Sequence, residues 1–165
     1  MAAQDSRSTR WADVPRSKAI ELEWLVDVDE WAAVHGERTE LPVPAAITAS
    51  LWDRIERVPF AHCGRDDART RARNVLRWAA TALSSYMAVS GGRAAESGVA
   101  SRPWRLRSED DEDSVSLIFA VPLRSESSAL GPLLLRLDLT ADELGKPSIT
   151  IGLREDFPSR TSRHR

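Results

Sequence analysis

The chain of 165 residues lacks several features that would restrict its class. Its single cysteine, Cys63, cannot form an internal disulfide, which agrees with a reducing compartment. No apolar run reaches about 18 residues, so we expect no membrane-spanning helix. The stretch from Met1 to Pro15 is polar and has no apolar core of the kind a secretory signal needs. We therefore expect a cytoplasmic protein with no membrane contact.

Patterns that bind metals or cofactors are also missing. The histidines are His35, His62 and His164, and they form no HxxxH spacing, while a CxxC pair is impossible with one cysteine. Structural zinc sites need three or four convergent ligands. The acidic run at 109–113 lacks the alternating ligands and the turn glycine of a calcium loop. We expect no metal and no cofactor, and the lack of a catalytic set favours a protein that is not an enzyme.

The charge and composition are those of an ordinary globular domain. A net charge of −2 gives no general attraction for nucleic acid or anionic lipid. Apolar residues make up 42% and charged residues 29%, and the length suits one hydrophobic core. We expect one domain over 17–157, between a disordered N-terminal segment, 1–16, and a disordered tail, 158–165.

Strict alternation of apolar residues is what the sequence has most clearly. A strand with one buried face needs an apolar residue at every second position. Leu25 is the one break in the first such segment. Short connections between the last four segments favour antiparallel neighbours. Strands are therefore predicted near residues 19–29, 102–107, 114–123, 132–139 and 148–154.

Two segments have helical spacing instead. In 45–58, the residues Ile47, Leu51 and Ile55 recur on one stripe, and Pro59 ends the helix. A longer apolar stripe runs through 66–90 and stops before a glycine pair. A short helical turn is also predicted over 29–35, with Gly36 ending it. Together these predict an α+β fold of two layers, with a mostly antiparallel sheet of about five strands against the long helix and the shorter one.

Tryptophan is the unusual residue, with six in the chain. It is enriched at protein interfaces because it buries a large area and keeps one polar group. Trp24 and Trp104 fall on the inward faces of predicted strands, and Trp31 faces inward on the predicted helical turn, whereas the other three do not. Trp78, Ala82 and Val89 lie roughly opposite the main stripe of the long helix, which predicts that this helix has contacts on two sides. The candidate contact residues are Trp78, Trp52, Trp11, Ala82 and Val89.

The leading hypothesis is a non-enzymatic protein-interaction module, an adaptor, accessory or regulatory subunit that could also form a homodimer. An unpaired outer strand gives a second route, because it can accept a partner's strand. One alternative is a small-ligand or catalytic pocket between sheet and long helix, with His62, Cys63 and Asp66 at its mouth. A buried, inert Cys63 is the simpler interpretation of that cluster.

A basic ridge on the long helix suggests a third possibility. Arg69, Arg73 and Arg77 are spaced four apart and could meet the phosphates of a nucleic acid. The same arginines could pair with acidic groups of the chain or lie over the edge of the core. Because the net charge is negative, we expect nucleic acid to be the least favoured partner.

Overall fold

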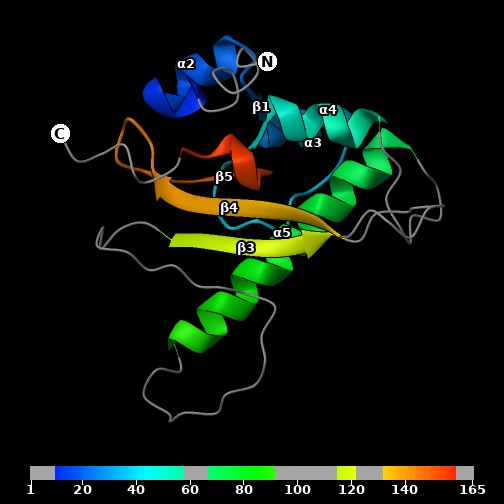
Figure 1. Ribbon diagram of the computed structural model, residues 1–165, viewed down its shortest axis with the longest axis vertical. Coiled ribbons are helices and arrows are strands. Elements are labelled where there is room, and N and C mark those ends of the chain that lie inside the picture. Colours follow the sequence, from blue (N-terminus) through cyan, green and yellow to red (C-terminus); the bar gives the residue numbers. More distant parts are fainter. Residues whose placement is uncertain (1–9, 58–66, 92–114, 122–131, 159–165) are drawn as a thin grey trace.

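A computed structural model describes residues 10–57, 67–91, 115–121 and 132–158 (Figure 1). It is an α+β fold with a five-stranded, mostly antiparallel sheet and one long helix, as the sequence predicts. Within these four ranges no helix is long and apolar enough to cross a membrane. The elements in chain order are η1 (Arg10–Asp13), α2 (Arg16–Glu21), β1 (Leu25–Asp27), α3 (Val28–His35), β2 (Ala45–Thr48), α4 (Ala49–Arg57), α5 (Ala68–Gly91), β3 (Val115–Val121), β4 (Leu133–Ala141), β5 (Pro147–Leu153) and η2 (Arg154–Asp156).

The sheet has the strand order β1-β2-β5-β4-β3. Its neighbours are antiparallel except for the parallel pair β2–β5. Residues opposite each other on paired strands point to the same face. Leu117 therefore lies beside Leu137, which lies beside Ile151, which in turn lies beside Ile47. This row of four buried side chains defines what we call the core face.

Helices α4 and α5 pack on the core face. Leu51 and Ile55 of α4 are buried there, together with Val75 and Ala79 of α5. Alanines at several positions of α5 let the helix approach closely, because they add little side-chain bulk. The buried Arg71 joins the two helices by donating hydrogen bonds to the carbonyl oxygens of the last turns of α4.

The opposite face, which we call the second face, carries a smaller apolar cluster. Ala19 of α2, Leu25 of β1 and Ala46 of β2 form it, with Trp11 and Ile20 packed against it. The N-terminal elements η1 and α2 therefore cover the second face at β1 and β2. Residues 10–13 form η1 and Arg16 begins α2, although the sequence placed them in a disordered segment, whereas 1–9 and 159–165 lie outside the described residues.

The predicted strand at 19–29 is wrong over most of its length. The chain forms the end of α2, a tight turn, the three residues of β1, and then the start of α3. Glu23 takes a left-handed conformation with φ 58, which reverses the chain. Asp27 then begins α3 by accepting hydrogen bonds from the amides of Asp29 and Glu30. The burial also departs from the predicted alternation, since Leu22 is exposed and the supposed break Leu25 is buried, although Val28 is buried as the pattern predicts.

The helix predicted at 45–58 begins four residues later in the structure than the sequence indicates. Residues 45–48 form β2 in the sheet interior, and only 49–57 form a helix, α4. Ala45, Ala46 and Ile47 all lie between β1 and β5 and are fully buried. Alanine favours a helix when only local preferences act, but pairing on both sides overrides that preference.

The other predicted elements agree better with the structure. Strands β3, β4 and β5 lie within one or two residues of the predicted ranges, and α5 matches the long helix. Helix α3 ends at Gly36, which takes a left-handed conformation with φ 64. The segment 102–107, predicted to be a strand, lies outside the described residues.

Candidate interaction surface

Helix α5 supplies the candidate surface. Its N-terminal half lies over the core face, and its last turns continue past β3 on the side away from β4 (Figure 1). The helix has large apolar side chains on both flanks, Trp78 near its middle and Met87 on its last turns. Trp78 is 39% exposed and Met87 is 57% exposed, although both are large and apolar.

Trp78 and Val89 lie on the same flank of α5. They are eleven residues apart, which corresponds to three helical turns and about 16 Å along the axis. Val89 is half-buried. Ala82 lies between them but is only 4% exposed and belongs to the core of the chain itself. Met87 follows Trp78 by nine residues, so it points from the opposite side of the helix.

The other two candidate tryptophans pack within the chain. Trp52 of α4 is half-buried against the core, edge-to-face with Trp31 of α3 at 5.9 Å between ring centroids. Trp11 of η1 contacts Phe157 edge-to-face at 5.3 Å. Its indole nitrogen donates a hydrogen bond of 2.9 Å to the carbonyl oxygen of Asp156. Among the five tryptophans in the described ranges, Trp78 alone is exposed.

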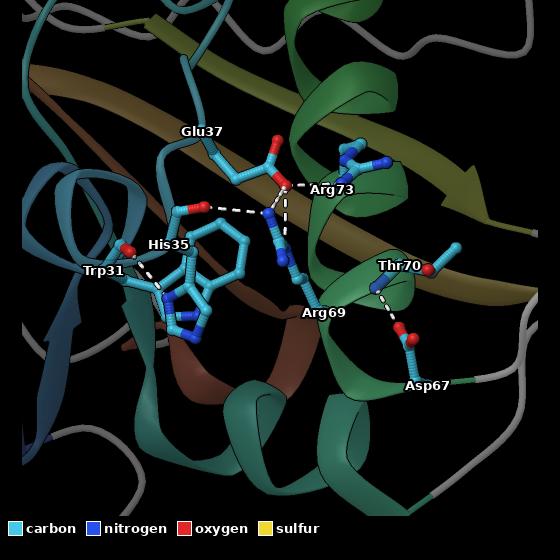
Figure 2. A network of polar contacts seen from close by, with 7 residues as sticks. All are labelled: Trp31, His35, Glu37, Asp67, Arg69, Thr70 and Arg73. Carbon is cyan, nitrogen blue, oxygen red and sulfur yellow. Dashed lines mark hydrogen bonds and ion pairs between the residues drawn. The ribbon is translucent and has the colours of Figure 1, made fainter.

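Two arginines of the basic ridge are held by one carboxylate (Figure 2). Arg69 Nε donates a hydrogen bond of 2.8 Å to Glu37, which follows α3, and Arg73 donates to the same oxygen. Arg69 also donates to the carbonyl oxygen of His35. The hydrogen bonds from Arg73 and Arg69 lower the pKa of Glu37 below its usual value. These contacts tie α5 to the end of α3, and Arg77 lies one turn further along, exposed.

An aromatic pair lies beside this ion-pair network. The rings of Trp31 and His35 are 5.0 Å apart, and His35 Nδ1 is 2.8 Å from the carbonyl oxygen of Trp31 (Figure 2). Asp67 caps the start of α5 by accepting a hydrogen bond of 2.7 Å from the amide of Thr70. The role of Glu37 could not be found from the sequence, because it is separated from its partners by more than 30 residues.

A buried carboxyl marks a second polar cluster, on the second face. Asp156 of η2 is 1% exposed and accepts hydrogen bonds from the hydroxyl of Thr48 and from the amide of Leu153. Burial raises the pKa of Asp156, against the hydrogen bonds from Ser50, Thr48 and Leu153. Within the described residues its Oδ1 has no hydrogen-bond partner. The contacts join η2 to β2 and β5, so the cluster has a structural role that sequence spacing did not indicate.

The candidate pocket residues His62, Cys63 and Asp66 lie outside the described residues, as does the acidic run 109–113. In the part of the chain that is described, no group of three metal-ligating side chains comes together. No protein family matches the chain, and neither a curated protein nor a solved structure is significantly similar to it. Any functional assignment therefore depends on this chain's own residues.

Proposed function

We propose that the protein is a non-enzymatic interaction module, an adaptor, accessory or regulatory subunit, and that it contacts its partner through α5 from Trp78 to the last turns of the helix. The exposure of Trp78 carries this proposal. A tryptophan side chain buries a large area on binding and is among the residues that contribute most to interfaces. Val89 on the same flank and Met87 on the other extend the apolar surface around the helix.

Isolated exposed apolar residues are common on protein surfaces and need no function. The α5 residues differ because three of them lie on one helix. Met87 and Val89 lie on the last turns, which continue past β3, and Trp78 lies near the middle of the helix with its side chain 39% exposed. The two alternative functions have less support. The arginines of the proposed nucleic-acid contact include two that pair with Glu37, and the candidate pocket lies outside the described residues.

The experiment compares tagged full-length protein with its Trp78→Ala variant by native mass measurement after purification from cells. We expect the wild type to carry a bound protein, either a second copy or another chain. We expect Trp78→Ala to reduce the bound fraction at least tenfold while shifting the melting temperature by less than about 4 °C.

Val34→Ala is the matched control, because Val34 is an exposed apolar residue on α3. It should leave the bound fraction unchanged. Equal binding by the wild type and Trp78→Ala would contradict the proposed surface. A wild type that carries no bound protein under any condition would contradict the proposed function itself.

A further inference from the structure

The two outer strands of the sheet differ in how well they are protected. An outer strand exposes unpaired backbone groups, and proteins usually shield it by shortness, charge, proline or a bulge. Strand β1 has three residues and ends in Asp27. Strand β3 has seven residues, Val-Ser-Leu-Ile-Phe-Ala-Val, with no charge and no proline. Among the described residues it pairs with β4 on one side and with no strand on the other.

The sequence of β3 is nearly symmetrical about Ile118. In an antiparallel pair of two β3 strands centred there, Ile118 lies opposite the same residue of the second copy. Leu117 then lies opposite Phe119, and Ser116 lies opposite Ala120. The ends match as well, since Val115 lies opposite Val121. On the core face large apolar residues meet, whereas on the second face the two Ile118 side chains meet at the centre and the small Ser116 and Ala120 flank them. Each side chain therefore has a partner of similar size.

The antiparallel arrangement also keeps the layers in register. Opposite residues of an antiparallel pair point to the same face. Leu117 and Phe119 are buried on the core face in each copy, so the two core faces would join on the same side of one continuous sheet. A parallel pair of identical strands related by a twofold axis would instead place them on opposite sides.

We infer that two copies of this chain associate through β3, antiparallel and centred on Ile118, to form a sheet of ten strands. The inference rests on the proposed function and names its partner as a second copy. We call the pairing of the two β3 strands the joint; with seven residues in each strand it is about 24 Å long. That joint alone falls short of the roughly 1,200–2,000 Å² that stable interfaces bury. The last turns of α5 continue past β3 on the side away from β4, where the second copy would lie (Figure 1). The exposed Met87 and the half-buried Val89 on these turns would add apolar area to the interface.

Introducing a charge at residue 118, the centre of the joint, tests the pairing. Wild-type protein should sediment as a dimer of twice the 18.3 kDa chain mass at tens of micromolar concentration. Ile118→Glu and Ile118→Lys should each sediment as a monomer, because like charges directly opposite each other repel. An equimolar mixture of the two variants should restore the dimer, since Glu would then face Lys. This rescue requires residue 118 to lie opposite itself in the partner.

The matched control is Leu134→Glu, which adds the same charge to the second face one strand further in. Leu134 is 43% exposed on β4, so this variant should remain dimeric. Folding of each variant is checked by thermal unfolding; Ile118 lies opposite Arg136 in β4, which favours a glutamate at that position in the monomer. Amide hydrogen exchange of the wild type tests the pairing without any variant. If two copies pair through β3, amide protection over 115–121 should increase with protein concentration.

Several results would overturn the inference. One is a monomeric wild type with concentration-independent amide protection over 115–121. Persistence of the dimer in both Ile118 variants would place the contact elsewhere. A dimer lost in Trp78→Ala but unaffected at Ile118 would exclude the β3 joint while leaving the proposed function intact. A mixture of the two variants that stays monomeric would also exclude the joint.

Discussion

The core face and the second face of the sheet are stabilised in different ways. On the core face, rows of leucine, isoleucine and phenylalanine pack against α4 and α5. The second face carries buried polar side chains instead, namely Thr48, Ser148, Thr150 and Asp156. The hydroxyl of Thr48 and the amide of Leu153 donate hydrogen bonds to Asp156, and the hydroxyl of Ser148 donates one to the carbonyl oxygen of Thr140. Apolar burial is non-directional and adds up over many contacts. The stability that a hydrogen-bonded cluster provides depends instead on the distances and angles of a few bonds. The core face should therefore carry most of the stability, and the second face most of the sensitivity to small geometric changes.

The second face is covered by other elements to a different extent at each strand. Elements η1 and α2 cover it at β1 and β2, and η2 with Phe157 covers it at β5. Arg136 of β4 lies 4.6 Å from the ring of Phe157 and pairs with Asp138. Further out, Leu134 is exposed and Ile118 and Ala120 are half-buried. The sheet thus becomes less covered toward β3, which is the edge inferred to join a second copy.

The largest loss of stability should come from a substitution in β4, whose side chains alternate between the core face and the second face. Leu137 and Leu134 belong to β4, but the first is fully buried on the core face and the second is exposed on the other. Leu137→Ala should lower the free energy of unfolding by about 2–5 kcal/mol, because it leaves a cavity. Leu134→Ala should lower it by less than about 1 kcal/mol. Denaturant unfolding measures both, and equal losses would contradict the division between the faces.

A single added methyl group should disturb the second face. A Cβ at Gly152 would lie 2.6 Å from Thr48 Cγ2, 2.8 Å from Thr48 Oγ1 and 3.0 Å from Asp156 Oδ2. Gly152→Ala should therefore destabilise the fold by about 1–3 kcal/mol. Adding Thr48→Ser removes the methyl group in contact and keeps the hydroxyl, so the double variant should recover part of the loss. Chemical denaturation of the four proteins tests this, and strictly additive effects would argue against the contact.

The smallest effect should appear as a pH dependence at Asp156. Because burial raises its pKa, the folded state retains the proton to higher pH than the unfolded state, whose carboxyl titrates near 3.8. The contribution of Asp156 to stability is therefore full below that value and decreases as the pH rises to the folded pKa. Each pKa unit of difference corresponds to about 1.4 kcal/mol.

Asp156→Asn should remove this dependence, since the amide does not titrate and still accepts a hydrogen bond. The stability of the variant relative to the wild type should increase with pH above 3.8 and then level off. Free energies of unfolding measured from pH 3 to 8 test the sign. A wild type that gains stability relative to Asp156→Asn over that range would show that the hydrogen bonds to the carboxylate outweigh its burial.

The sequence by itself determined the elements whose local pattern and tertiary environment agree. Strands β3 and β4 alternate because one face is covered more than the other. Strand β5 alternates between large apolar residues on the core face and small or polar residues on the second face, although both of its faces are buried. Helix α5 follows from its apolar stripe, and Gly36 ends α3 because glycine adopts a left-handed conformation easily. An exposed Trp78 also follows from its place off the main stripe of that helix.

Tertiary structure decided everything that depends on a distant neighbour. Residues 45–48 form a strand because β1 and β5 lie on both sides, although their alanines favour a helix. Pairing with β2 limits β1 to three residues where the alternation suggested eleven. Ala82 is in the core and Trp11 is packed against Phe157, which spacing along one element cannot reveal. Glu37 meets Arg69 and Arg73 across more than 30 residues. The physical reason is common to all of these: local periodicity reports which face of an element is apolar, whereas burial and pairing depend on which other element covers that face.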